Sequence, residues 1–284
     1  MTEVNCTPLC ARATGRYAKL APMLLASATG LLYLLATFVL ATSLHRGGRP
    51  AATWLPLALG ALVLHALVHA LAWHASGGTD MHFFSALSLV GLGMAALTAL
   101  FGASGRMAAL GVVVFPLAAL MLGAFAAYGQ HRVEVLDWRL QLHAWAALLS
   151  YATLAVAALL AVMLWLQERA LRQHSFHGWT RALPPLTELE TLLFRTVTVG
   201  FLLLSATLLT GVLFVENLFA QHLVHKTVLS VLSWLVFGAL LLGRWRRGWR
   251  GRVAVRWTLV AMVLLVLAFF GSKAVLELVL HRTG

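Results

Sequence analysis

Histidine is the residue type in this sequence with the clearest potential for chemistry. The 284-residue chain contains twelve histidines, and neutral imidazole is a common ligand of metal ions and of haem iron. Seven of them fall where we expect the outer ends of membrane-spanning helices: His74, His82, His131, His143, His222, His225 and His281. Their concentration on one face indicates a metal or haem site, but histidine is also well tolerated among lipid headgroups. Composition alone leaves both interpretations open.

His143 and His225 are the strongest candidate pair. His143 lies at the start of the apolar stretch LQLHAWAALLSYA, and His225 at the start of HKTVLSVLSW. Both stretches are predicted to run inward from the outer surface, which places the two imidazoles in one layer. If the two helices are neighbours, the imidazoles can approach a flat cofactor from opposite faces, and haem fits that geometry. A tetrahedral zinc site needs further His, Cys or carboxylate ligands.

Two further pairs have helical spacing. His65 and His69 are separated by four residues, so they share one face of a helix near mid-membrane. Polar groups at that depth are costly and mark functional sites by default; the pair could be a second haem site, a relay for haem transit, or interhelical hydrogen-bonding groups. Lys273 and Glu277 have the same spacing, which favours a salt bridge. A contact from Lys273 to a haem propionate is the alternative.

The composition is that of a membrane protein. The chain is 61% hydrophobic and 11% charged, whereas soluble domains average about 45–50% and about 25%. No single soluble core holds this excess, which excludes a soluble enzyme and a disordered chain. The net charge of +12 sits at helix ends, as expected for membrane insertion, so nucleic acid is not an expected partner.

The apolar runs predict an all-α, polytopic membrane protein with about eight transmembrane helices, each near the ~20 residues that a bilayer requires. The expected spans are 20–43, 52–74, 84–103, 107–128, 142–166, 193–214, 226–243 and 255–280. We expect one transmembrane domain over residues 20–284. Residues 1–19 form an N-terminal extension, which is not translated if the start is Met23.

The basic residues predict the orientation. Six arginines and no acidic residue lie between positions 244 and 256, so this loop is expected on the cytoplasmic side. Alternation of the spans then places both termini outside. Arg12, Arg16 and Lys19 disagree with this orientation; either the strongly basic loop 244–256 overrides them, or translation begins at Met23, which would remove the disagreement.

Six segments in fixed order carry a resemblance to a known family. They are LHALVHAL (64–71), FFSALSLV (83–90), LQLHAWAALLSYA (140–152), LPPLTELETLLFRTVTVGFLLLSATLLTGVLF (183–214), HKTVLSVLSWLVFGALLLGRWRRGWRGR (225–252) and FFGSKAVLELVL (269–280). Together they resemble the cytochrome c assembly family, in the CcsA/HemX-like branch that includes the YpjD-type inner membrane proteins. The resemblance runs from the second span to the C-terminus.

The resemblance implies a multi-pass protein of a bacterial inner membrane that handles haem at the outer face. His143 matches the first outer haem-ligating histidine of the family, and His225-Lys226 looks like the HemX/YpjD pattern. We therefore expect non-covalent haem b with His143 and His225 as axial ligands to the iron. Lys226, Lys273 and Arg139 are candidate propionate contacts, because cationic donors bond strongly to carboxylates.

The chain departs from the pattern of the full synthetases in one outer loop. Their tryptophan-rich signature corresponds here to VENLFAQHLVHKT (215–227), which contains no tryptophan. The platform that presents haem to an apocytochrome is therefore missing, and we do not expect this chain alone to act as a synthetase. We expect a haem-binding protein that assists c-type cytochrome biogenesis. Its expected partners are the lipid bilayer, haem, and other cytochrome c assembly proteins or an apocytochrome.

Two other functions fit parts of the sequence. A non-enzymatic, HemX-like regulator or scaffold of haem synthesis or cytochrome assembly would use the basic loop 244–256 to dock a partner or anionic lipid, and its histidines would be dispensable. A small-solute transporter fits less well. Transporters often show internal repeats and mid-membrane polar groups, whereas this sequence has no clear repeat and only His65 and His69 at that depth.

Overall fold

The computed structural model describes residues 8–46, 53–78, 80–103, 108–129, 137–173, 185–214 and 221–271, with the backbone alone for 8–21, 221–223, 225 and 271. The helices are α1 (Pro8–His45), α2 (Trp54–Ser76), α3 (Phe83–Gly102), α4 (Gly111–Tyr128), α5 (Trp138–Arg172), α6 (Leu186–Phe214), α7 (Gln221–Arg247) and α8 (Gly251–Val266). A 3-10 turn, η1 (Ala108–Leu110), precedes α4, and a π-helical turn, η3 (Leu267–Gly271), continues α8. The described residues thus include eight helices that are long and apolar enough to cross a membrane, which confirms the predicted all-α, multi-pass fold.

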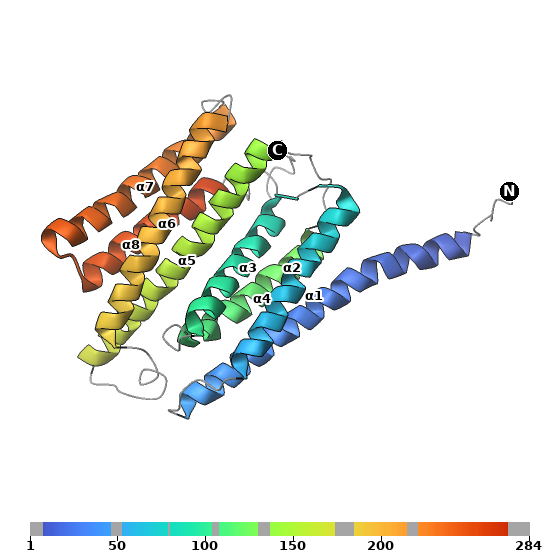
Figure 1. Ribbon diagram of the computed structural model, residues 1–284, viewed down its shortest axis with the longest axis horizontal. Coiled ribbons are helices and arrows are strands. Elements are labelled where there is room, and N and C mark those ends of the chain that lie inside the picture. The colour runs from blue at the N-terminus through green and yellow to red at the C-terminus, as the bar shows by residue number, and fades with distance from the viewer. Residues whose placement is uncertain are drawn as a thin grey trace.

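The helices form two sets of four (Figure 1). In the first set, α1 packs on α2 and α4, and α3 packs on the same two helices. In the second set, α6 and α8 each pack on both α5 and α7. The main contact between the sets is that of α3 with α5. Each set is therefore a closed ring in which alternate helices face each other across the diagonal.

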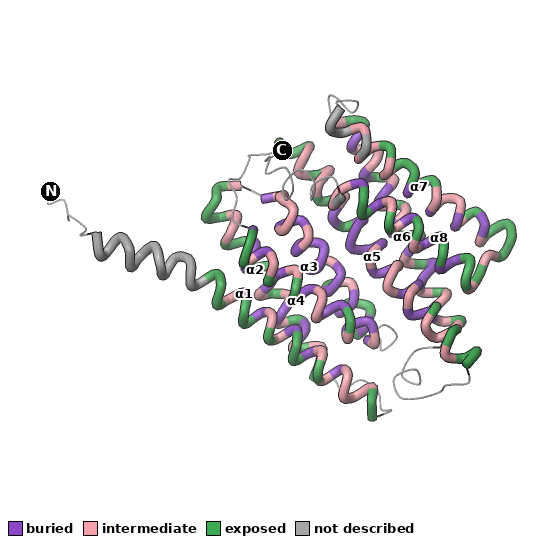
Figure 2. The backbone as a smooth tube through the Cα atoms, turned by 180° about the vertical axis from the view of Figure 1, so that it is seen from behind, coloured by how far each residue is buried: buried purple, intermediate pink, exposed green. Residues whose placement is uncertain are grey.

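Burial follows this arrangement. About two thirds of the apolar window of α5 is buried, compared with 22% in α7, because α5 contacts both its own set and α3. Figure 2 shows buried positions concentrated along α3 and α5 and exposed ones along α1 and α7. Large apolar side chains such as Leu31, Val63 and Leu202 are exposed. A bilayer solvates such side chains, so the outer faces are lipid-facing surfaces.

Several helices extend beyond the predicted spans. The fifth span was expected at 142–166, but α5 covers Trp138–Arg172; the sixth was expected from 193, but α6 begins at Leu186. Hydropathy reports the apolar segment only, whereas backbone hydrogen bonding continues a helix into polar surroundings. α1 begins at Pro8, so part of the predicted extension 1–19 is helical and continuous with the first span. Residues 272–280 of the expected last span lie outside the described residues.

Glu190 fixes the turn between α7 and α8. Its Oε1 accepts a hydrogen bond from the backbone N–H of Gly251 at 3.2 Å and from Arg244 Nη1 at 3.5 Å. Gly248 and Gly251 have positive φ values of 65° and 53°, a conformation that side chains with a Cβ disfavour. A carboxylate at a helix N-terminus also complements the helix dipole. The acidic residue in the first turns of α6 therefore caps α8 and holds the basic turn in place.

Candidate functional site

His143 is held by α6 in one defined orientation. Its Nδ1 lies 3.1 Å from Thr210 Oγ1. The Thr210 hydroxyl also lies 3.0 Å from the carbonyl oxygens of Ala206 and Thr207, and it can donate its proton to either of them. With its proton donated within α6, Thr210 Oγ1 can accept a hydrogen bond from His143 Nδ1–H, and we assign this tautomer to His143. This assignment leaves the lone pair of the imidazole on Nε2.

Gly211 makes room for the His143 ring. A Cβ at this position would lie 3.2 Å from His143 Cε1, closer than most side-chain contacts. Gly211 is buried, and a residue without a side chain lets the imidazole pack closely against α6. Thr210 and Gly211 together form a seat for the ring, called the His143 seat below.

The free nitrogen of His143 has the chemistry of a metal ligand. Among the described residues no group bonds to Nε2, and the side chain is only partly buried. Metal-ligating histidines generally donate their other ring N–H to an oxygen acceptor, which fixes the tautomer and orients the ring. The His143 seat provides that acceptor. The residue can therefore offer Nε2 to an iron or other metal centre at the end of the second set where α5 begins.

His225 lies on α7, the helix diagonally opposite α5. From the sequence, a haem site was considered for the case in which these two helices are direct neighbours. In the structure, α6 and α8 lie between α5 and α7. The axes of neighbouring helices lie roughly 8–10 Å apart. In a ring of four helices, the axes of two diagonally opposite helices are therefore farther apart than this by a factor of about 1.4. That wider span suits a flat ring system between two imidazoles. α5 and α7 also begin at the same end of the bundle, as expected (Figure 1). The His225 side chain itself lies outside the described part of the chain.

Of the three residues predicted to contact the haem propionates, the structure describes two, Arg139 and Lys226. Arg139 is exposed, one helical turn before His143, with its guanidinium 5.7 Å from the Trp138 ring. Lys226 is half-buried in the first turns of α7 and has an interaction within the protein. Lys273, together with Glu277, lies outside the described residues. Arg139 and Lys226 therefore lie at the same end of the second set as His143.

His65 and His69 lie at the centre of the first set and are fully buried. One assignment of donors and acceptors gives a hydrogen-bond partner to all but one of the polar side-chain atoms in this cluster. Tyr33 of α1 donates to His65 Nδ1 (3.2 Å), His65 Nε2–H donates to Ser88 Oγ of α3 (2.9 Å), and Ser88 donates to His69 Nε2 (3.0 Å). Of the ring nitrogens and hydroxyl groups in this chain of hydrogen bonds, only His69 Nδ1 has no partner among the described residues. Three helices are thereby tied together by a buried polar chain.

This polar chain is also closely packed. The His69 ring stacks on Phe125 of α4 with centroids 4.4 Å apart, and the His65 and His69 rings stack at 5.6 Å. Three of the four imidazole nitrogens already take part in hydrogen bonds. A metal at either histidine would have to replace one of these bonds. The geometry therefore favours the interhelical role among the alternatives that the sequence left open.

Replacing Ser88 by alanine is expected to destabilise the protein. The change leaves two buried imidazole nitrogens without partners, and each unsatisfied buried group costs about 1–3 kcal/mol. Chemical unfolding of the detergent-solubilised protein measures the difference in free energy. Ser76→Ala is the matched control, because Ser76 is exposed and bonds to nearby backbone carbonyls. Equal stabilities of the two variants would contradict a cohesive role for the buried polar chain.

Sequence patterns did not reveal the partners of these histidines. Thr210 and Ser88 lie 67 and 19–23 residues away from the histidines they contact. Each is a small polar residue in an apolar span, which is the available signal. Such residues commonly bond to their own helix, as Thr196 and Thr198 do here. Thr210 does so as well, so only the packing of the helices shows which of these residues also contacts a histidine.

Comparisons with known proteins place the sequence among related membrane proteins. A model of the family described as cytochrome C assembly protein matches residues 54–280. Inner membrane protein YpjD of Escherichia coli (strain K12) is 30% identical over 234 residues, which cover 80% of this chain and 89% of that protein. An uncharacterized 28.8 kDa protein of Azospirillum brasilense is 38% identical over 170 residues, 57% of this chain and 62% of that protein.

A more distant relative matches a shorter segment. Cytochrome c biogenesis protein CcsA of Synechococcus sp. (strain CC9605) is 30% identical over 99 residues, 34% of this chain and 32% of that protein. No solved structure was found to match the chain. The family match begins at Trp54, where α2 begins, and includes His143 and His225. The chain therefore belongs to the cytochrome C assembly protein family and is a multi-pass protein of a bacterial inner membrane.

Proposed function

We propose that this protein binds haem b non-covalently between α5 and α7 and so assists c-type cytochrome biogenesis. The observation that carries the proposal is the orientation of His143: its Nδ1 faces Thr210 Oγ1 at 3.1 Å, which leaves Nε2 for a ligand outside the described residues. His143 and His225 are the proposed axial ligands. Family membership supports a role in cytochrome c biogenesis.

The residues around His143 are suited to binding haem. Haem supplies a redox-active iron whose two axial positions accept imidazole nitrogens. This chain would contribute orientation: Thr210 holds the proton at Nδ1, which makes Nε2 the better donor, and Gly211 lets the ring lie against α6. The diagonal of the second set provides two facing helices that begin at the same end of the bundle.

The cationic residues at this end are proposed to bind the haem propionates. Arg139 is on the same face of α5 as His143, because the two are four residues apart. Lys226 directly follows His225 on α7, and Lys273 is the third candidate. Ion-paired hydrogen bonds to carboxylates are roughly twice as strong as neutral ones. Anionic propionates would thus orient the haem edge toward these residues.

His65 and His69 are assigned a different role in this proposal. We propose that they join α1, α2 and α3 through Tyr33 and Ser88, and that they do not form a second or transit site for haem. Their hydrogen bonds and their stacking on Phe125 support this assignment. The haem proposal then concerns the second set of helices alone.

Genetic complementation tests the biological role. Deletion of the gene in its native host is expected to lower the amount of membrane c-type cytochrome, measured by haem-dependent peroxidase staining. Wild type should restore the level, and His143→Ala at equal abundance should not. If wild type and His143→Ala both restore the cytochrome level, the result would support the regulator or scaffold function, in which the histidines are dispensable. Unchanged cytochrome levels in the deletion strain would contradict a role in biogenesis.

A further inference from the structure

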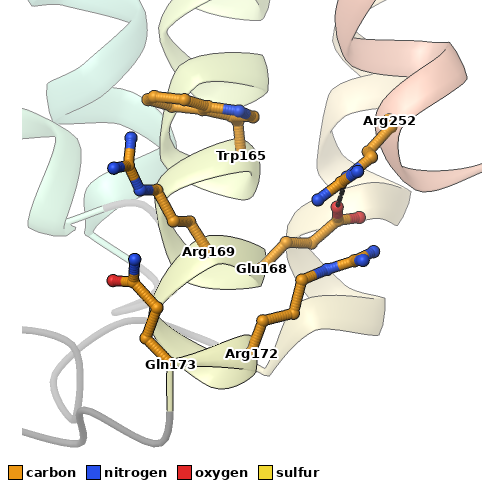
Figure 3. Close-up of a pocket in the computed structure, with 6 residues that line it drawn as sticks. All are labelled: Trp165, Glu168, Arg169, Arg172, Gln173 and Arg252. Atoms are coloured by element: carbon orange, nitrogen blue, oxygen red, sulfur yellow. Dashed lines mark ion pairs between the residues drawn. The ribbon is translucent and has the colours of Figure 1, made fainter.

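A groove rich in arginine lies between α5 and α8, at the end of the second set away from His143. It consists of two adjoining hollows that share Trp165 and Arg252. The first, of about 350 Å³, is lined by Trp165, Glu168, Arg169, Arg172, Gln173 and Arg252 (Figure 3). The second, of about 490 Å³, is lined by Val162, Trp165, Arg252, Val255, Arg256 and Leu259. We call the two hollows together the α5–α8 groove.

The polar part of the groove is strongly positive. Its four arginines are exposed, and the single acidic residue leaves a formal net charge of +3. Glu168 is already paired with Arg252, whose Nε lies 4.0 Å from the carboxylate (Figure 3). Arg169, Arg172 and Arg256 form no ion pair with an acidic residue in the described ranges. These three guanidinium groups can therefore receive an anion from outside.

Trp165 links the polar part to an apolar part. Its indole is partly exposed, and the Arg169 guanidinium lies 5.6 Å from the ring, in the range of a cation–π contact. Val162, Val255 and Leu259 continue the groove along the two helices away from their polar ends. Tryptophan is characteristic of the headgroup layer of a membrane. The groove therefore passes from a cationic headgroup level to a hydrocarbon level.

We propose that the α5–α8 groove binds an anionic phospholipid. The anionic headgroup would lie near Arg169 and Arg172 of the first hollow and Arg256 of the second, and an acyl chain would lie along Val162 and Leu259. Basic pockets between transmembrane helices on the cytoplasmic side are known to suit anionic lipid headgroups. The distribution of arginine predicts that this end faces the cytoplasm. A free phosphate would use the charged part alone and leave the apolar part without a ligand.

Ion pairs beside the α5–α8 groove involve other arginines than Arg169, Arg172 and Arg256. Glu190 and Glu168 pair with Arg244, Arg250 and Arg252 of the α7–α8 turn, and so satisfy the charges next to the helix ends from within the protein. Arg169, Arg172 and Arg256 are among the exposed arginines that these two carboxylates leave without an acidic partner. A bound anion would join these two helices at their polar ends. This proposal is independent of the haem proposal, because it involves no residue of the His143 seat.

Lipid titration of the full-length, delipidated protein in detergent tests the proposal. Native mass spectrometry would compare phosphatidylglycerol with phosphatidylcholine of the same acyl chains. We expect phosphatidylglycerol to bind about tenfold more tightly or better, and the Arg169→Gln/Arg172→Gln double variant to weaken its binding by about 10- to 30-fold. Neither arginine pairs with a described acidic side chain, so the fold should persist. Arg256→Gln is a second, independent variant and should show a smaller loss.

The control removes the same charge elsewhere. Arg46→Gln/Arg195→Gln replaces two exposed arginines at the same end of the bundle but outside the groove, and it should bind phosphatidylglycerol as wild type does. Equal binding of the two lipids, or an equal loss in the control, would overturn the proposal in favour of general surface attraction. Displacement of the lipid by an equal concentration of glycerol phosphate would overturn it in favour of a free-anion site.

Discussion

The His143→Ala variant is expected to purify without haem. In this account His143 Nε2 is one of two axial ligands, so its removal leaves the iron with a single imidazole and an open position. Sharp α and β bands on dithionite reduction should be present in wild type and absent from the variant. His225→Ala should give the same result from the opposite helix. The ratio of haem to protein, measured as the pyridine haemochrome, quantifies the loss.

His74→Ala is the matched control for these two variants. His74 is exposed and lies near the end of α2, in the other set of helices. This control should retain haem at the level of wild type. After removal of haem, thermal unfolding in detergent should be similar for wild type and the three variants, because alanine is well tolerated in a helix. Full haem content in His143→Ala would exclude His143 as a ligand.

Gly211→Leu is expected to reduce haem retention without changing a ligand. A Cβ at Gly211 would already lie 3.2 Å from His143 Cε1, and the further carbons of leucine would add to this crowding. The imidazole would have to rotate away from Thr210 and lose the bond that holds its tautomer. Changes in the groups that orient a metal ligand typically cost 10- to 100-fold in affinity. Haem loss to apomyoglobin, followed by absorbance, measures the effect.

A second glycine separates this effect from general crowding. A Cβ at Gly123 of α4 meets no atom within 4 Å, so Gly123→Leu adds the same side chain where it faces open space. It should retain haem as wild type does. Gly211→Ala should be intermediate, because a single methyl group requires a shift of only a few tenths of an ångström. Wild-type haem retention in Gly211→Leu would contradict the described His143 seat.

The spans themselves could be predicted from the sequence because the thickness of the bilayer fixes the length of an apolar run. All eight predicted spans correspond to helices, with the described part of the last ending at Gly271. Helix ends were less predictable. α5 continues through Gln167, Glu168 and Arg169, since intrahelical hydrogen bonds need no apolar side chains. Hydropathy cannot detect such an extension beyond the hydrocarbon layer.

The arrangement of the helices was beyond the sequence. The prediction placed His143 and His225 in one layer, and the helices that carry them do begin at the same end of the bundle. Periodicity shows which face of a helix is apolar but not which helix packs on it, so the diagonal of the second set could not be foreseen. The same limit hid the pairing of Thr210 with His143 and the connection of Tyr33 to His65.

The absorption spectrum of the purified wild-type protein tests the central claim most directly. The protein would be prepared in mild detergent from haem-replete cells, and its oxidised and dithionite-reduced forms compared. The account predicts about one haem b per chain with the sharp reduced bands of a low-spin, bis-histidine iron. A colourless, folded protein that also fails to take up added haem would contradict haem ligation by His143 and His225, and would favour the regulator or scaffold function.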